Sequence, residues 1–290
     1  MPEGQVVRAH SSEFWVEAGP CVYQCSLRGR FRHTGEKVYA GDMVEFTALT
    51  PSGGVIDSIL PRQSALTRPP VANVEQAVIV FTPAEPALDL TAVDRFLVSV
   101  ARAGIRPALC LNKVDLIPLA HGEEIVAPYR RAGFAAVCAS TRARLNIGGL
   151  AELLSGRLSV FAGLSGVGKS SLLNAVAPGL SLRTGALSAK VLRGTHTTRH
   201  VELLALPGGG RVVDTPGFSY VDLAGCPPEA VLAAYPEFDE FSLECRFSGC
   251  RHVNEPDCAV KAAVAVGRLD AGRHGRYKAL LTEVLAERRY

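Results

Sequence analysis

The sequence predicts a multidomain chain in which a small β-barrel is followed by an α/β domain and then by a short, mainly helical module. Three observations support this division. Residues 5–60 hold short alternating apolar runs between turns, continuous apolar runs alternate with helical spacing from residue 76 onward, and four cysteine and histidine residues cluster within residues 245–258. The expected domain ranges are 1–68, 72–223 and 224–290.

The composition is typical of a soluble multidomain protein. With 290 residues and 48% hydrophobic content, the chain is long enough to bury more than one core. Its eight cysteines do not resemble a secreted disulfide framework, and no apolar run approaches the length that spans a bilayer. The net charge of +3 is too small to indicate a nucleic-acid partner by itself. We therefore expect a cytoplasmic protein with no membrane partner.

The amino-terminal segment predicts a five-stranded barrel. Its alternating runs favour an OB-fold, and a small SH3-like barrel fits nearly as well. Arg28, Arg30 and Arg32 recur at every second position, so on a strand they would share one face. That face would either hold phosphates or protect a strand edge, and both interpretations stay open. Residues 62–71, which contain two prolines, are predicted to form the linker out of the barrel.

The strongest motif lies between a predicted buried strand, residues 158–161, and a helix that is expected to begin at Lys169. Two glycines with four residues between them, followed by lysine and serine, match a phosphate-binding loop. Glycine lets successive backbone N–H groups point at phosphate oxygens, and the helix N-terminus adds positive charge. Lys169 is expected to reach the β- and γ-phosphates, and Ser170 to ligate Mg²⁺. The loop comprises Gly163, Leu164, Ser165, Gly166, Val167, Gly168, Lys169, Ser170 and Ser171.

A second motif, Asn112-Lys113-Val114-Asp115, follows a predicted buried strand. A carboxylate can accept two hydrogen bonds at once, and the N1–H and 2-amino group of guanine present such a donor pair, which adenine lacks. Asp115 is therefore predicted to select guanine. Asn112 and Lys113 are expected to brace the loop and pack along the base.

Three further segments are predicted to complete a nucleotide site. The backbone N–H of Ala139, after a short strand, is expected to meet the guanine carbonyl. Either Thr197 or Thr198 is expected to close over Mg²⁺ and the γ-phosphate. Asp214 is predicted to hold Mg²⁺ through water, and the N–H of Gly217 to sense the γ-phosphate.

The loops follow one another in an unusual order, because the guanine motif precedes the phosphate loop. A circular permutation accounts for this order, since it moves the chain ends while keeping the packed layers. The segment that ends at Gly217 then runs directly into the last residues, so we expect the nucleotide state to affect the carboxy-terminal module. Phe218 stands where many GTPases place a glutamine that orients the attacking water. Intrinsic hydrolysis is therefore expected to be slow, with His196 or a group from a partner orienting the water.

The carboxy-terminal cluster has the spacing C-x4-C-x-H-x5-C, formed by Cys245, Cys250, His252 and Cys258. Three thiolates and one imidazole match a closed, tetrahedral structural zinc site, with no position left open for a catalytic water. Basic residues around the cluster are predicted to face an RNA backbone, and the alternative is a merely soluble helical tail. These residues are Arg246, Arg251, Lys261, Arg268, Arg273, Arg276 and Lys278.

Together these motifs resemble the bacterial ribosome small-subunit-dependent GTPase A family, in the residue ranges 163–171, 195–200 and 250–261. The resemblance implies a monomer that hydrolyses GTP when stimulated by the small ribosomal subunit, during late maturation of that subunit. It also implies rRNA binding through the barrel and the zinc module, bound GTP or GDP, Mg²⁺ and Zn²⁺, with other assembly factors as further partners. Two positions differ from the family pattern. Thr195 stands where arginine or glutamine is expected, and Cys138 stands where serine is usual. Gly166 occupies the position at which potassium-activated GTPases commonly have asparagine, so potassium dependence stays open.

Two other classes of function stay open on the sequence alone. A phosphotransferase would use the same phosphate loop, but Asp115 argues against it. An RNA-binding scaffold would keep a structural nucleotide without turning it over. The preference for GTP over ATP tests the first alternative, and phosphate release with small subunits tests the second.

Overall fold

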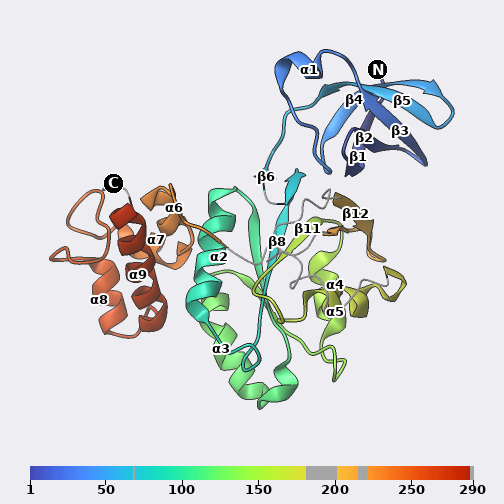
Figure 1. Ribbon diagram of the computed structural model, residues 1–290. Coiled ribbons are helices and arrows are strands. Elements are labelled where there is room, and N and C mark those ends of the chain that lie inside the picture. Colours follow the sequence, from blue (N-terminus) through green and yellow to red (C-terminus); the bar gives the residue numbers. More distant parts are fainter. Residues whose placement is uncertain (68, 181–200, 215–220, 288–290) are drawn as a thin grey trace.

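The computed structural model describes residues 1–67, 69–180, 201–214 and 221–287. Three bodies follow one another along the chain: a barrel, a central α/β domain and a helical module. In Figure 1 the barrel lies above the central domain, and the helical module lies beside it, next to α2. Within the described residues, no helix combines the length and apolar character needed to cross a membrane.

The amino-terminal body is a closed barrel of five strands. The strands lie in the order β1-β2-β3-β5-β4, and β4 pairs with β1 to close the barrel. Only the β3–β5 pair is parallel, which is the OB-fold arrangement, so the SH3-like alternative is wrong. Val6, Val16 and Phe46 fill the interior. The elements are β1 Glu3–His10, β2 Glu13–Ala18, β3 Cys21–Leu27, α1 Phe31–Thr34, β4 Met43–Thr50 and β5 Gly53–Ile59.

The predicted strand with three alternating arginines does not form. Strand β3 ends at Leu27, and after a turn at Gly29 the chain enters α1, where Phe31 is buried in the barrel. Arg28 instead pairs with Asp57, with 2.6 Å between Nε and Oδ1. Burial of Phe31 through a helical turn outweighs the alternating pattern, because one large buried ring contributes more than a charged face gains in water.

The segment predicted as a linker contains a small hairpin, β6 Ala65–Thr67 and β7 Pro70–Ala72. Leu66 and Val71 are buried, and the N–H of Ala72 donates to Ala40 in the barrel at 2.9 Å. The expected boundary at residues 68–72 therefore falls inside this hairpin.

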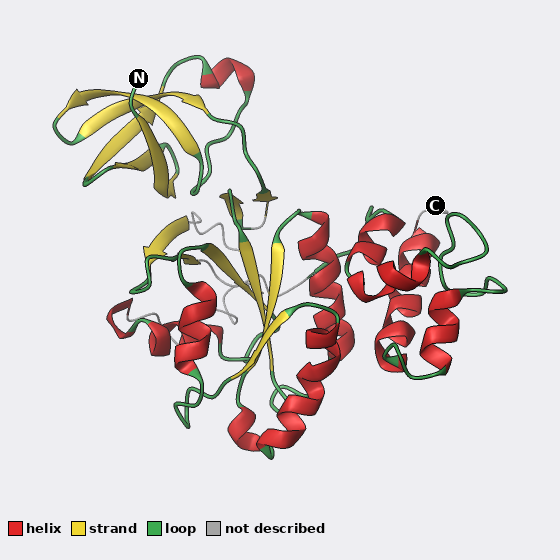
Figure 2. Cartoon of the chain, turned by 180° about the vertical axis from the view of Figure 1, so that it is seen from behind, coloured by secondary structure: helices red, strands yellow, loops and turns green. Residues whose placement is uncertain are grey.

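The central domain is a six-stranded sheet in the order β10-β9-β8-β11-β13-β12, in which β12 alone is antiparallel to its neighbour. Helices cover both faces, as Figure 2 shows. Ile79 of β8 packs in one core with α2 and α3, and the adjacent Val78 packs in the other with α4 and α5. This two-sided burial explains the continuous apolar runs. The elements are β8 Gln76–Phe81, α2 Leu90–Arg102, β9 Arg106–Leu111, η1 Val114–Leu116, α3 Leu119–Arg131, β10 Ala135–Cys138, α4 Ile147–Leu154, β11 Leu158–Ala162, α5 Lys169–Val176, η2 Pro178–Leu180, β12 Val201–Ala205 and β13 Arg211–Asp214.

The sheet of the central domain continues into the barrel. Strand β12 pairs with β1, with Arg8 opposite Glu202 and Ala9 opposite Val201. A side-chain ion pair supports this junction, since a guanidinium nitrogen of Arg211 in β13 lies 2.6 Å from Glu17 in β2. The barrel thus meets the central domain at its antiparallel edge strand.

The carboxy-terminal module is built from short helices around one long helix. Helix α9 packs against α6, α8 and the α2 helix of the central domain. The elements are α6 Pro228–Ala233, η3 Pro236–Phe238, α7 Asp239–Ser242, α8 Ala259–Ala265 and α9 Ala271–Glu287.

Candidate functional site

The phosphate loop connects β11 to α5 and depends on glycine at three positions. Gly163, Gly166 and Gly168 have φ values of 132°, 84° and 94°, which side-chain-bearing residues rarely adopt. A Cβ atom at Gly163 would lie 2.1 Å from the carbonyl oxygen of Val80, and one at Gly168 would lie 2.4 Å from the side-chain nitrogen of Asn112. The loop therefore requires glycine for its conformation and for the close approach of its neighbours.

Lys169 begins α5 and turns back over the loop. Its Nζ donates to the carbonyl oxygens of Gly163 at 2.6 Å and Leu164 at 2.9 Å. Burial lowers the pKa of Lys169 to about 8. An ammonium held beside a helix N-terminus in this way is suited to a phosphate oxygen, which would favour its charged form further.

The base loop is tied directly to the phosphate loop. Asn112 is buried, and its Nδ2 donates to the carbonyl oxygen of Val167 at 2.8 Å. Lys113 has a φ of 61°, and its Nζ donates to the carbonyl oxygen of Glu85 at 2.6 Å. Asn112 and Val167 lie 55 residues apart in the sequence, and this buried hydrogen bond joins the two motifs.

Asp115 is exposed and is held by a residue that the sequence analysis did not name. The Oγ of buried Ser140 donates to Oδ1 of Asp115 at 2.5 Å, and the N–H of Ala143 donates to the same Oγ at 3.0 Å. Ser140 therefore orients the carboxylate that is predicted to choose the base. Its position just after β10 was the available signal, because the ends of parallel strands meet at one edge of the sheet.

The prediction for the backbone N–H of Ala139 is wrong. This N–H donates to the carbonyl oxygen of Leu111 at 2.8 Å, because the pairing of β10 with β9 continues one residue beyond the strand. The next N–H, of Ser140, donates to Leu145 at 3.1 Å. Within the described residues, Thr141 is the first residue of this loop whose N–H has no backbone acceptor.

The remaining nucleotide residues divide into two groups. Ser170 and Ser171 lie in the first turn of α5, and Asp214 ends β13, next to the strand that delivers the phosphate loop. The other predicted residues lie outside the described ranges, as does the start of the segment expected to couple the site to the carboxy-terminal module. These residues are His196, Thr197, Thr198 and Gly217.

The four predicted metal ligands come together. Their ligand atoms all lie within 4.8 Å of one another. The Sγ atoms of Cys245 and Cys258 are 3.9 Å apart, and Nδ1 of His252 lies 3.6 Å and 3.4 Å from them. Tetrahedral zinc with ordinary bond lengths would give edges of about 3.8 Å between sulfurs and about 3.6 Å between sulfur and nitrogen. The cluster, which also includes Cys250, therefore has the donor set and the spacing of a structural zinc site.

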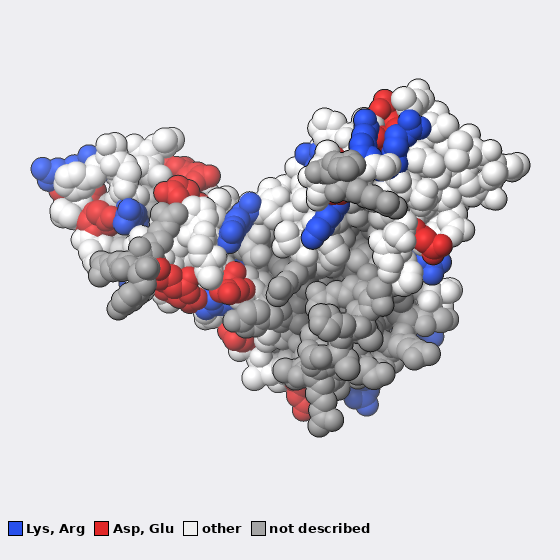
Figure 3. Space-filling view, turned by 45° about the horizontal axis from the view of Figure 1, so that its top comes forward, with Lys and Arg blue, Asp and Glu red and all other residues white. Residues whose placement is uncertain are grey.

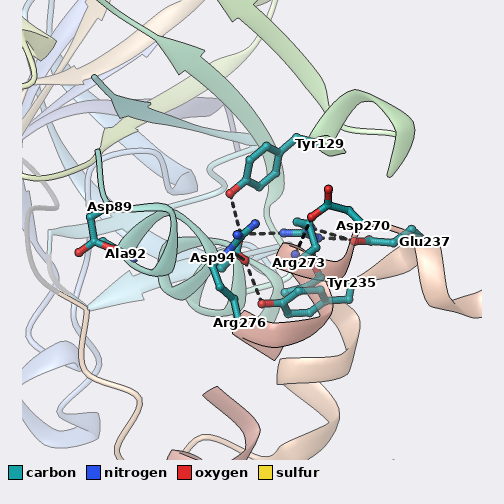
Figure 4. A network of polar contacts seen from close by, with 10 residues as sticks. Asp89, Ala92, Asp94, Tyr129, Tyr235, Glu237, Asp270, Arg273 and Arg276 are labelled. Carbon is teal, nitrogen blue, oxygen red and sulfur yellow. Dashed lines mark hydrogen bonds and ion pairs between the residues drawn. The ribbon is translucent and has the colours of Figure 1, made fainter. Parts of the chain in front are cut away.

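The predicted basic surface around this cluster is partly wrong. Arg273 is 1% exposed, and its guanidinium donates to Asp94 of α2 at 2.7 Å. Arg276 donates to the same carboxylate at 2.6 Å (Figure 4). Tyr129 and Tyr235 also donate to Asp94, at 2.9 Å and 3.1 Å. These charges fasten the module to the central domain instead of facing a partner.

Other basic residues of the module are balanced locally. Arg246 pairs with Asp257 at 2.7 Å and Arg268 with Glu240 at 3.4 Å. On the face drawn in Figure 3, basic and acidic side chains are interspersed over this module. The surface is therefore less basic than the sequence alone indicates.

Comparison with known proteins agrees with this architecture. The model for the RsgA N-terminal domain matches residues 3–56, and the model for the RsgA GTPase matches residues 59–224. The sequence is 44% identical to the small ribosomal subunit biogenesis GTPase RsgA of Geobacillus sp. (strain WCH70), covering 98% of each chain. It is also 44% identical to the protein of the same name from Moorella thermoacetica, covering 99% of each.

Two solved structures share the whole fold. The crystal structure of YjeQ from Thermotoga maritima superposes with a TM-score of 0.84 at 38% identity, covering 98% of each chain. That of YloQ, described as a circularly permuted GTPase, gives a TM-score of 0.84 at 35% identity, covering 99% of this chain and 96% of the other. The permuted order of the two loops, the barrel and the match over nearly the full length lead to one conclusion: the chain belongs to the RsgA family of GTPases.

Proposed function

We propose that this chain hydrolyses GTP during biogenesis of the small ribosomal subunit, as the names of its relatives state for them. The observation that carries this proposal is the junction of the two loops. Asn112 ties the base loop to the phosphate loop, and Ser140 holds the carboxylate of Asp115 through a hydrogen bond. A guanine-selecting carboxylate fixed to a phosphate cradle is what a GTPase requires.

In this proposal each residue of the base site has one role. Asp115 accepts from N1–H and the 2-amino group of guanine, and the N–H of Thr141 takes the role expected earlier of Ala139. Asn112 and Lys113 support the base from the side of the phosphate loop. This change of assignment is supported by the N–H of Thr141, which has no backbone acceptor in the part of the chain that the structure describes.

The triphosphate end is served by the loop 163–171 and by the ends of neighbouring strands. Lys169 would contact the β- and γ-phosphates. Ser170 would hold Mg²⁺ directly, and Asp214 would hold it through water. Thr197 or Thr198, with the N–H of Gly217, responds to the γ-phosphate. Hydrolysis needs a group that orients water, and His196 or a partner supplies it, since Phe218 has no hydrogen-bonding side chain.

We also propose a structural zinc ion held by Cys245, Cys250, His252 and Cys258. The near-tetrahedral spacing supports it, as does a loop that contains little apolar material to hold it in place. The ion would join the end of α7 to the start of α8, because Cys245 follows one helix and Cys258 caps the other.

The proposed partner is the small ribosomal subunit. We propose that the chain acts as a cytoplasmic monomer and binds the rRNA of this subunit, with other assembly factors as further partners. The proposed functional units are the barrel 1–68, the GTPase domain 72–223 and the zinc module 224–290. With Arg273 and Arg276 committed to Asp94, the residues proposed to face RNA in the zinc module are Arg251, Lys261 and Lys278.

Phosphate release from GTP and ATP, with and without purified small subunits, tests this function. We expect GTP to be preferred and the subunit to stimulate release. Asp115→Asn should weaken the binding of GTP and favour the binding of xanthosine triphosphate, because the N–H donor of the amide matches the 2-carbonyl of xanthine. Glu124→Ala, which changes an exposed carboxylate on α3, is the matched control. Equal use of ATP would indicate a phosphotransferase, and no stimulation by the subunit would indicate a scaffold with a structural nucleotide.

A further inference from the structure

A fifth side chain touches the metal-ligand cluster. Ser242, the last residue of α7, places its Oγ 3.2 Å from Nε2 of His252, whereas Nδ1 of the same ring faces the cysteine sulfurs. The same Oγ lies 2.7 Å from the carbonyl oxygen of Phe238. One hydroxyl group thus joins the imidazole to the preceding turn of the chain.

The directions of these two hydrogen bonds follow from the protons available. A serine hydroxyl carries one proton, and a carbonyl oxygen can only accept. Two oxygens 2.7 Å apart with no proton between them would repel, so the proton of Ser242 points at Phe238. The Oγ therefore meets the ring as an acceptor, and Nε2 of His252 must carry a proton.

We propose that Ser242 is a positioning residue for the metal site, which holds neutral His252 in the Nε2–H tautomer with the lone pair of Nδ1 directed at the ion. The inference rests on the zinc site proposed above. A metal-ligating histidine commonly donates its second N–H to an acceptor that fixes the ring and its tautomer, and here that acceptor is a serine hydroxyl. Because His252 is 1% exposed, water does not readily replace a lost acceptor.

Two contacts from α9 act on the backbone of this loop. His274 of α9 lies 2.8 Å from the carbonyl oxygen of His252, and the hydroxyl of Tyr277 donates to the carbonyl oxygen of Arg251 at 2.8 Å. Within the described residues, Ser242 makes the one polar contact to Nε2. Loss of the Ser242 hydroxyl therefore removes the acceptor of Nε2 of His252, while the loop keeps its hydrogen bonds to α9.

Zinc affinity of the full chain, measured by competition with a chelator, tests the role of the hydroxyl. Ser242→Ala should weaken zinc binding by about 10- to 100-fold. Ser242→Thr keeps a hydroxyl and should restore most of the affinity. Ser248→Ala, an exposed serine between Cys245 and Cys250, is the matched control and should bind as tightly as the wild type. GTP affinity should be unchanged in all three variants, since their substitutions lie in the C-terminal module.

The tautomer is tested separately by long-range ¹H–¹⁵N NMR of the zinc-loaded, histidine-labelled wild-type chain. We expect a metal-bound Nδ1 and a protonated Nε2 for His252. This spectrum decides the question even if Ser242→Ala fails to fold. Coordination through Nε2, or wild-type zinc affinity in Ser242→Ala, would overturn the role of Ser242 and leave the zinc site standing. A wild-type chain that takes up no zinc would overturn both.

Discussion

The carboxylate of Asp94 is predicted to hold the carboxy-terminal module on the central domain. It is fully buried, and it accepts from Arg273 and Arg276 of α9 and from the hydroxyls of Tyr129 and Tyr235. Burial and the charge of Asp94 raise the pKa values of both tyrosines, so their hydroxyls stay protonated and donate. Asp94→Ala leaves Arg273 with Glu237 as its remaining carboxylate partner, and it removes the acceptor of Arg276 and of two buried hydroxyls. The variant should lower the free energy of unfolding by about 3 kcal/mol.

The matched control lies on the same helix. Asp89 caps α2 by accepting from the N–H of Ala92 at 2.9 Å, and Asp89→Ala should lower the free energy of unfolding by about 1 kcal/mol. Urea unfolding followed by circular dichroism gives the two values. Hydrogen exchange should place the loss in peptides of α6 and α9, with the barrel unchanged. A variant of Asp94 no less stable than that of Asp89, or faster exchange spread evenly over the chain, would refute the reasoning.

Three further predictions concern the nucleotide site. Burial holds the pKa of Lys169 at about 8, and a bound phosphate favours the charged form of this side chain. GTP affinity should therefore stay level below pH 8 and fall by up to about tenfold per pH unit above it. Binding above pH 8 should take up protons, which calorimetry in buffers of different ionisation enthalpy measures. Ser140→Ala removes the hydrogen bond to the base-selecting carboxylate and should weaken GTP binding by about fivefold, or about 1 kcal/mol. In a competition assay, the weak binding of ATP should stay the same. Gly168→Ala should abolish nucleotide binding in a folded chain, because the new Cβ would lie 2.4 Å from a buried amide, whereas Gly179→Ala, with nothing within 4 Å, should bind normally.

The central domain was largely predictable from the sequence because its strands are covered on both faces. A run such as residues 76–81 is apolar at nearly every position, and the structure makes it the strand β8 with all six residues buried. The phosphate loop was predictable for a related reason. Glycine is required at Gly163 and Gly168 by positive φ and by close neighbours, so the spacing of the motif records the geometry directly.

The misses arise where the partner of a group decides its role. The N–H of Ala139 donates to the carbonyl oxygen of Leu111, and this hydrogen bond follows from the pairing of β10 with β9, which the sequence does not show. Arg273 is as basic in the sequence as Arg251, but its partner Asp94 lies 179 residues earlier. Charge alone cannot distinguish a cation that faces solvent from one that closes an interface between two domains.

Two serines, Ser242 and Ser140, were missed in the sequence for a common reason. Ser242 precedes the first ligand of the metal cluster by three residues, which sequence spacing for zinc sites does not cover, because the spacing rules describe ligands and not the groups that orient them. Ser140 was missed for the same reason at the base site. Both are serines that accept or donate beside a residue whose own role was predicted.

The two attachments of the central domain differ in stiffness. The barrel is joined through two residue pairs of a main-chain ladder, through the backbone hydrogen bond from Ala72 to Ala40, and through one partly exposed ion pair. An exposed ion pair of this kind is worth at most about 1 kcal/mol and weakens with salt. The zinc module is joined through a buried charge that cannot be parted cheaply. We therefore expect the barrel to change its orientation more readily than the zinc module, which the buried ion pair between Arg273 and Asp94 fixes to the GTPase domain.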